Sequence, residues 1–501
     1  MKAIKYLILS MVAIVGLGSC SSDFLNTEYT AALDEEQASQ AAAANPDVFL
    51  NGIWSSMVAY EGGSAQAHER YSYLSWLMYL QTMGEDMSHE NGQTEYYFDY
   101  QLDYGEEPYV RTRLIWQGFY ALIDKANAII NLYPAGGSNA GVKGLVGQAY
   151  AIRGFAYDNL IQVYQDYLDE SGNIRRDAPG IPLIYTAVDG KTQAEIEDYT
   201  GRNTVGEVID QAGKDLEKAV ELLGYGYVRP SKNYIDLNVA NGLLARHYLY
   251  TQQWEKAAKA AKTARLGYPL MDQKTLLSGF NDISNTEWMW GFKHSAETQT
   301  SFASFFSWMD SSGDGYGGLW GAVTIDKRLY DQIWDSDYRK ALFTGPEGDE
   351  TLPKHAGAPY ANLKFKAKDG WLSDYLYMRA SEMVLIEAEA YAHLGDAAQA
   401  AQVLNELLKA RNPQMSLNLA SVEDVYLQRR IELWGEGFSY FDLKRLNKGI
   451  DRTYDGNNYP IAFQVKYAAH NDRWTFQIPL SEIQENSRIG EEDQNPWSNI
   501  E

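Results

Sequence analysis

The stretch EMVLIEAEAYAHLGDAAQAAQVLNELLKARNP, residues 382–413, decides the fold class. Its small and apolar residues recur at spacings of three and four on both sides of Gly395-Asp396, as on the inner faces of two helices. Glycine followed by aspartate is typical of the turn between two helices. The segment therefore predicts two helices, near residues 379–413, that pack closely through Ala388, Ala400 and Leu404.

Two other segments repeat this design. One lies near residues 239–269 and contains LARHYLYTQQWEKAAKAAKTARLGYP (244–269). The other lies near residues 113–168 and combines WQGFYALIDKANAIINLY (116–133) with QAYAIRGFAYDNLIQVYQDY (148–167). The spacings resemble those of tetratricopeptide helix pairs. Because the pairs are far apart in sequence, we expect a mainly α fold in which such pairs form a scaffold with long irregular insertions and a few short strands.

The carboxyl-terminal part adds two further elements. Ser421 and Asp424 match a capping box, and the residues after them predict a core helix that includes Leu427, Ile431, Trp434 and Phe438. Residues 473–479 (RWTFQIP) alternate between apolar and polar side chains, which predicts a half-buried strand.

The first residues, MKAIKYLILSMVAIVGLGSC, have the pattern of an export signal. Two lysines precede an apolar stretch that is too short to span a bilayer as an ordinary helix. The stretch ends in Leu17-Gly18-Ser19-Cys20, which resembles the cleavage site of bacterial lipoproteins. We expect residues 1–19 to be removed, Cys20 to carry a lipid, and residues 20–30 to form a tether. Cys20 is the single cysteine of the chain, so no internal disulfide can form.

Composition limits the partners. The 501 residues carry 43 Lys and Arg against 67 Asp and Glu, a formal net charge of −24, and no basic run appears. Nucleic acid is therefore excluded as a partner, because binding a phosphate backbone requires a basic face. No long linker divides the rest of the chain, so we expect residues 31–501 to form one domain.

The insertions near residues 59–111 and 285–322 carry the candidate ligand site. A sugar ring has apolar C–H faces and a hydroxyl rim, so its binder needs flat aromatic rings beside polar side chains. Aromatic residues make up 13% of the chain, and both insertions mix them with carboxylates and amides. In the first insertion the candidates are Trp76, Tyr96, Tyr97, Asp86 and Asn91. In the second, which has five glycines between residues 313 and 321, they are Trp308, Tyr316 and Trp320.

The sequence gives little support for a metal site or for catalysis. Asp310, Ser312 and Asp314 match the start of a calcium-binding loop, but Gly321 stands where a bidentate glutamate is required, so calcium is only a weak expectation. The seven histidines show no zinc-binding spacing. Sequence alone neither finds nor excludes a pair of catalytic carboxylates. We expect no cofactor and no enzymatic activity.

Four separated stretches resemble the SusD/RagB family. They are Cys20 with Asp23-Phe24-Leu25, Trp116 to Asn127, Arg379 to Glu382 running into Ala388-Glu389-Ala390, and the segment that holds Arg430 to Leu433, Glu436-Gly437, Asp442 to Arg445, Ile478-Pro479 and Gln494 to Pro496. Ser439, Leu446 and Trp497 depart from the family pattern. The resemblance implies a helical surface lipoprotein of the outer membrane that delivers a ligand, commonly an oligosaccharide, to a SusC-like TonB-dependent transporter. Peptide capture, as on the RagB side of the family, a surface glycoside hydrolase and a structural or adhesive surface protein stay open as alternatives.

Overall fold

A row of antiparallel helices forms the scaffold. The computed structural model describes residues 47–60, 68–185, 201–298 and 300–498, so the predicted signal, Cys20 and the tether lie outside the described residues. Contacts divide the chain into residues 1–48 and 49–501, and the second unit is described below. Its long helices are α6 (Val110–Leu132), α7 (Ala140–Tyr164), α8 (Val205–Leu223), α9 (Leu237–Tyr250), α10 (Trp254–Ala264), α15 (Ala380–His393), α16 (Ala397–Arg411) and α17 (Val422–Glu432).

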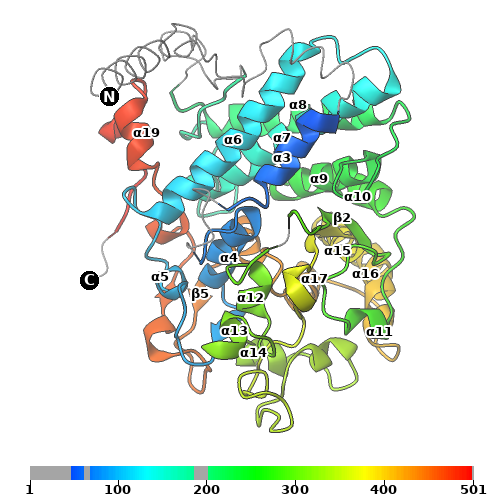
Figure 1. Cartoon of the computed structure of the whole chain (residues 1–501), viewed down its shortest axis with the longest axis vertical. Coiled ribbons are helices and arrows are strands. Elements are labelled where there is room, and N and C mark those ends of the chain that lie inside the picture. Colours follow the sequence, from blue (N-terminus) through cyan, green and yellow to red (C-terminus); the bar gives the residue numbers. More distant parts are fainter. Residues whose placement is uncertain (1–46, 61–67, 186–200, 299, 499–501) are drawn as a thin grey trace, which may run out of the picture. The chain divides into compact units, whose positions relative to one another are not determined.

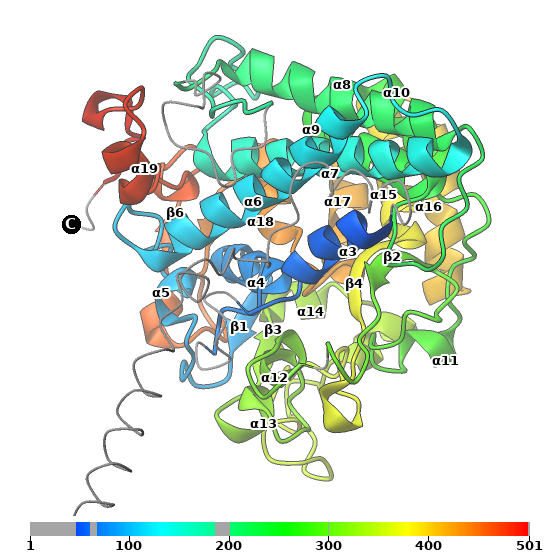
Figure 2. The same ribbon diagram turned by 45° about the horizontal axis from the view of Figure 1, so that its top comes forward.

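These helices pack in sequence order, from α6 through α10, and then α10 packs against α15 and α15 against α16 (Figures 1 and 2). The three predicted helix pairs are confirmed, and so is the mainly α fold class. The stacking of the third pair on the second shows that the intervening residues 265–379 leave the helical row and return to it. Helix α8, which we did not predict, completes the row between α7 and α9.

Side-chain caps fix where several of these helices begin. The Asp396 side chain accepts a hydrogen bond from the backbone N–H of Gln399 at the start of α16, directly after the turn at Gly395. The capping box of Ser421 and Asp424 is also present. The predicted turn at Gly395-Asp396 and the predicted capping box are both confirmed.

The remaining elements are short. The shorter helices are α3 (Asp47–Ser56), α4 (Tyr73–Met83), α5 (Tyr97–Tyr100), α11 (Gln273–Leu276), α12 (Phe305–Met309), α13 (Tyr316–Leu319), α14 (Lys327–Asp331), α18 (Ser439–Arg445) and α19 (Leu480–Glu485), and there are 3-10 turns at Tyr338–Leu342, Asp369–Trp371, Ile461–Phe463, Asp472–Trp474 and Glu491–Asp493. The strands form antiparallel pairs, β1 (Met87–His89) with β3 (Val323–Ile325), β2 (Trp288–Phe292) with β4 (Tyr375–Arg379), and β5 (Ile450–Asp451) with β6 (Lys466–Tyr467). None of the long insertions therefore builds a larger sheet within the described part of the chain.

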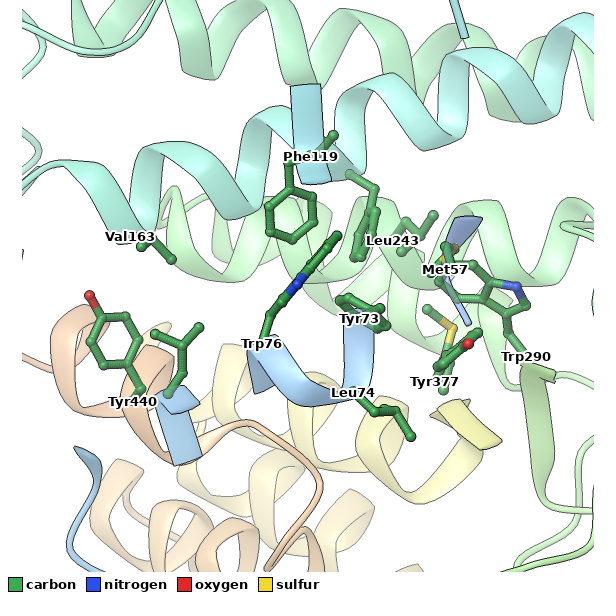
Figure 3. Close-up of a cluster of buried hydrophobic side chains, with 14 of the residues drawn as sticks. Met57, Tyr73, Leu74, Trp76, Phe119, Val163, Leu243, Trp290, Tyr377 and Tyr440 are labelled. Atoms are coloured by element: carbon green, nitrogen blue, oxygen red, sulfur yellow. The ribbon is translucent and has the colours of Figure 1, made fainter. Parts of the chain in front are cut away.

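Helix α4 is the centre of the hydrophobic core. Tyr73 packs edge-on against Phe155 and Tyr377, with ring centroids 5.5 and 5.3 Å apart. Trp76 points from α4 toward α6, where its ring centroid lies 5.0 Å from that of Phe119 (Figure 3). The indole of Trp76 is buried, so it is a core residue and offers no open face to a ligand.

Two predicted carboxyl-terminal elements are wrong in part. Helix α17 ends at Glu432, before Trp434 and Phe438, because Gly435 and Gly437 adopt positive φ angles that end the helix. Residues 473–479 form no paired strand. Their apolar side chains are buried as predicted, but the alternation comes from contacts with loops and helix ends, such as the hydrogen bond from Phe476 N to Val163 O.

A buried charge network joins the helical row to the insertions. Its members are Glu287 on the segment before β2, Asp337, Arg339, Lys364, Arg379 at the end of β4, Arg411 at the end of α16, and Glu432 and Glu436 around the end of α17. Four basic side chains face four acidic ones, so the network is electrically balanced. Balance matters because an unpaired charge in the interior costs several kcal/mol.

Glu432 is the hub of this network. Its carboxylate lies 2.6 Å from Arg379, 2.9 Å from Arg411 and 3.4 Å from Arg339. Burial alone would raise the pKa of Glu432, but the guanidinium groups of Arg411 and Arg379 outweigh that effect and hold the pKa well below its usual value. Glu432 is therefore ionised in the folded protein.

No described helix is both long enough and sufficiently apolar to cross a membrane.

Candidate functional site

Two insertions that are remote in sequence meet at one strand pair. Strand β1 of the first insertion pairs with β3, directly after the second insertion, with Met87 opposite Ile325 and His89 opposite Val323 (Figure 2). The pairing extends past β1, because Glu90 N donates to Ala322 O and Ala322 N donates to a Glu90 carboxylate oxygen. The segments that follow β1 and precede β3 are thus held side by side.

Trp320 and Asn91 lie at the end of this strand pair. The Asn91 side-chain amide donates to the carbonyl oxygen of Trp320 at 2.6 Å, and its side-chain oxygen accepts a hydrogen bond from Gln93 N at 2.8 Å. Asn91 therefore fixes the backbone that carries the tryptophan. The Trp320 side chain is 40% exposed, so one part of its ring is open to solvent while another part is supported.

The support consists of two buried rings. Tyr316 and Trp308 stack with centroids 4.1 Å apart and an interplanar angle of 20°, and Trp320 packs on this stack, 4.6 Å from Tyr316 and 6.0 Å from Trp308. Trp308 also donates from its indole nitrogen to His68 O at 3.0 Å. Because Trp308 and Tyr316 are buried, the interpretation that they stack on a ligand themselves does not fit the structure. They hold Trp320 in place.

The turn between these rings folds back on itself. Gly318 lies so close to the carbonyl oxygen of Gly313 that a Cβ atom would collide with it. This close approach requires glycine and brings Tyr316 back under the ring of Trp320. The glycine-rich composition thus serves the packing of the turn.

In this turn Asp310 accepts several hydrogen bonds. One carboxylate oxygen of Asp310 accepts hydrogen bonds from the backbone N–H and the hydroxyl of Ser312, and the other accepts from Ala367 N. Asp310 therefore fixes the turn, and the weak expectation of calcium stays a prediction. Within the described residues, no group of three or more metal-ligating side chains is found.

The remaining candidates lie elsewhere. Asp86 is buried and paired with Arg430 at 2.6 Å, where it anchors the start of β1 to α17. Tyr96 is buried, and its hydroxyl lies 2.7 Å from that of Tyr71. Its ring packs edge-on against the ring of Trp308. The structure therefore gives neither residue access to a ligand. Tyr97 is exposed, but it packs on Phe98 and Phe463 rather than on Trp320.

Glu90 and His355 complete the site. Glu90 is one of the polar residues of the first insertion, whereas His355 was not predicted. His355 Nδ1 lies 2.6 Å from the Glu90 carboxylate, which also accepts the hydrogen bond from Ala322 N. Exposed Leu319 lies beside Trp320 in the sequence. The site that results has an aromatic face, an apolar neighbour and a polar edge of Asn91, Gln93 and Glu90.

Known proteins share this architecture. A family model described as starch-binding associating with outer membrane matches residues 35–249, and the model of the SusD family matches residues 354–497. A SusD-like protein, P38, from Formosa agariphila is 21% identical over 395 residues, which cover 68% of this chain and 73% of that protein.

Solved structures agree with these matches. A SusD-like carbohydrate binding protein from Bacteroides vulgatus is 26% identical with a TM-score of 0.75, covering 91% of this chain and 98% of that one. A laminarin binding SusD-like protein has the same fold, with 17% identity, a TM-score of 0.67, and coverage of 90% of this chain and 98% of that one.

The helical row, the insertions and these matches define a ligand-binding scaffold of the kind found in outer-membrane nutrient uptake. The chain belongs to the SusD/RagB family. Proteins of this family bind ligands rather than transform them, and their ligands are typically carbohydrates.

Proposed function

We propose that this protein captures a glycan at Trp320, with the half-exposed, doubly supported indole as the observation that carries the proposal. A sugar presents an apolar C–H face that packs on a flat ring. A ring that is already fixed loses little conformational freedom when the ligand arrives, so more of the contact energy appears as affinity.

The polar edge supplies orientation. The exposed residues Asn91 and Gln93, together with the partly exposed Glu90 carboxylate, present amide and carboxylate groups to the hydroxyl rim of a sugar. Glu90 is held by His355, so its position is also fixed before binding.

We further propose that the protein works at the outer membrane, attached through a lipid on Cys20, and delivers the glycan to a SusC-like TonB-dependent transporter. The description of the matching family, which names the outer membrane, and the export and lipidation pattern of residues 1–20 support this. Copurification of the protein with a transporter from solubilised membranes tests the partnership.

The binding proposal is tested by titration calorimetry of the full mature chain, purified in detergent. The probes are laminarin, amylopectin, xylan and mannan, together with a peptide mixture. We expect heat from a glycan class, and the Trp320→Ala variant should bind that glycan about tenfold or more weakly, because an aromatic contact of this kind is worth about 1 kcal/mol or more.

Trp334→Ala is the matched control, since Trp334 is 58% exposed and no part of the site. It should bind like the unchanged protein. Heat from the peptide mixture alone would replace the glycan proposal by peptide capture, and release of sugar products from a bound glycan would show a hydrolase instead.

A further inference from the structure

A cavity of about 90 Å³ lies between the helical row and helix α18, and it shares no residue with the Trp320 site. Much of its lining is apolar and comes from four helices, with Leu77 of α4, Phe155 of α7, Leu243 and Leu249 of α9, and Phe441 of α18. A water molecule occupies about 30 Å³ in the liquid, so the cavity has the volume of about three waters or of one small organic molecule.

Arg429 of α17 also lines this cavity and brings a hydrogen-bond donor without a partner. Its Nε donates to the Asp442 carboxylate at 2.9 Å. Its Nη1 is buried and meets no hydrogen-bond acceptor in the part of the chain that the structure describes. The whole residue is 3% exposed. Because a buried N–H without an acceptor destabilises the fold, an acceptor that enters the cavity and reaches Arg429 would bind favourably.

The charges around the cavity are already balanced. Three guanidinium groups pair with three carboxylates, namely Arg246 with Glu382, Arg429 with Asp442, and Arg445 with Glu389. The other two carboxylates of the lining also have partners, since Asp158 meets His247 and Tyr250, and Glu436 meets Lys364 and Arg379. A charged ligand would therefore bring an uncompensated charge into the interior, which is costly.

We infer that this cavity binds a small uncharged molecule with an oxygen acceptor, such as a short-chain amide, ketone or alcohol. The oxygen of the ligand accepts the free hydrogen bond of Arg429, and its aliphatic part packs on the leucine side chains of the lining. Asn159 and Leu376 border the cavity and are partly exposed, so we expect entry near them. An oligosaccharide is too large for this volume, and the inference does not rest on the proposed glycan capture.

The test uses saturation-transfer NMR on the full mature chain in detergent, with protein-free micelles as the blank. The probes are propionamide, propionate and propylammonium, which have aliphatic parts of similar size but differ in charge and in acceptor. Propionamide should give a protein-dependent signal. Propionate should bind about tenfold or more weakly than propionamide because of its charge, and propylammonium should give no signal because it has no acceptor.

Two variants test the cavity from different sides. Arg429→Met removes the donor and should weaken propionamide binding about tenfold or more. Leu376→Phe fills part of the cavity, leaves Arg429 in place and should weaken binding as well. Leu394→Phe is the matched control, because Leu394 is 43% exposed at the end of α15 and no part of the lining. Both this control and Trp320→Ala should bind propionamide like the unchanged protein.

The outcomes keep this inference separate from the proposed function. Absence of a protein-dependent propionamide signal overturns it, and so does equal binding of propylammonium. Unchanged binding in Leu376→Phe also overturns it, and this variant decides the question if Arg429→Met does not fold. If propionamide binds as expected while no glycan binds, the inference stands and the proposed function fails.

Discussion

The buried charge network and the Trp320 site differ in how their side chains are used. In the network the central charged groups meet partners from distant segments, as Arg379 meets Glu287, Glu432 and Glu436. In the Trp320 site two buried rings and one amide fix a single tryptophan and leave part of it open. The contacts of the charge network all stabilise the fold, whereas the Trp320 site leaves one surface open for a ligand.

The residues that carry the family resemblance divide unevenly between the two regions. Arg379, Glu432 and Glu436 belong to the network, and Arg430 holds β1 through Asp86. None of the resemblance motifs contains Trp320 or Asn91. The resemblance therefore reports on the scaffold, while the proposed glycan site lies in insertions outside those motifs.

The largest loss of folding stability is expected from removing Glu432, the hub of the buried charge network. Glu432→Ala leaves Arg379, Arg411 and Arg339 around an absent carboxylate, and breaking a buried pair in this way costs about 3–5 kcal/mol. Urea unfolding followed by circular dichroism measures the loss. The glycan affinity of the fraction that stays folded should not change.

Lys448→Ala is the control for this variant, because it breaks an exposed ion pair with Glu423, and such pairs contribute little. Equal stability of Glu432→Ala and the unchanged protein would show that the network is not a stabilising element and would remove the contrast with the Trp320 site.

The second prediction concerns how the stability of the fold depends on pH. Glu389 is buried beside Arg445; burial alone would raise its pKa, but Arg445 lowers the pKa to about 2. A carboxylate with a folded pKa below its unfolded value near 4.5 stabilises the fold above that pH and loses the contribution as the pH falls toward 2. The shift corresponds to roughly 3 kcal/mol.

Glu389→Gln tests this dependence. The stability difference between the unchanged protein and the variant should be largest near neutral pH and should shrink as the solution is acidified. Urea midpoints across a pH series give the result. A difference that stays constant over the whole series would mean that Glu389 does not titrate as its contacts predict.

The smallest effect is expected for glycan binding, when Asn91 at the edge of the Trp320 site is replaced. Asn91→Ala removes the hydrogen bonds to Trp320 O and from Gln93 N, which are worth about 0.5–1.5 kcal/mol each. Glycan affinity should fall about three- to tenfold, since the freed backbone no longer fixes the indole. The melting temperature should fall by a few degrees at most, because a loss of about 1 kcal/mol shifts it little in a chain of this length. Asn131→Ala, an exposed asparagine on α6, serves as the control, and a matching loss there would argue against a positioning role for Asn91.

Sequence periodicity was sufficient for the scaffold. Small and apolar residues at spacings of three and four located all three helix pairs, and the turn at Gly395 followed from local chemistry. The missed helix α8 carries an equally clear signal, a capping box of Thr204 and Glu207 before an apolar stripe. The predicted strand at residues 473–479 is wrong because alternation indicates only that every second side chain is buried, and here loops and helix ends bury those side chains without a partner strand.

The site could be predicted only in outline. Trp320 and Asn91 were both named as candidates, but 229 residues separate them, and only the pairing of β1 with β3 brings them together. Only the conformation of the glycine-rich turn decides which of its aromatic rings is exposed to solvent. The amino-acid composition does not reveal that conformation.

The network also places a constraint on how the chain is made. Arg379 and Arg411 are synthesised before Glu432. The ion pair that anchors strand β1 can form only after Arg430 has been synthesised, because its partner Asp86 lies 344 positions earlier. Until the carboxyl-terminal region has been synthesised, Arg379 and Arg411 lack Glu432, so we expect the charged interior to close last. Contacts of such long sequence separation also slow folding. A truncation before residue 430 should therefore leave buried charges unpaired and give a protein without a cooperative unfolding transition in circular dichroism.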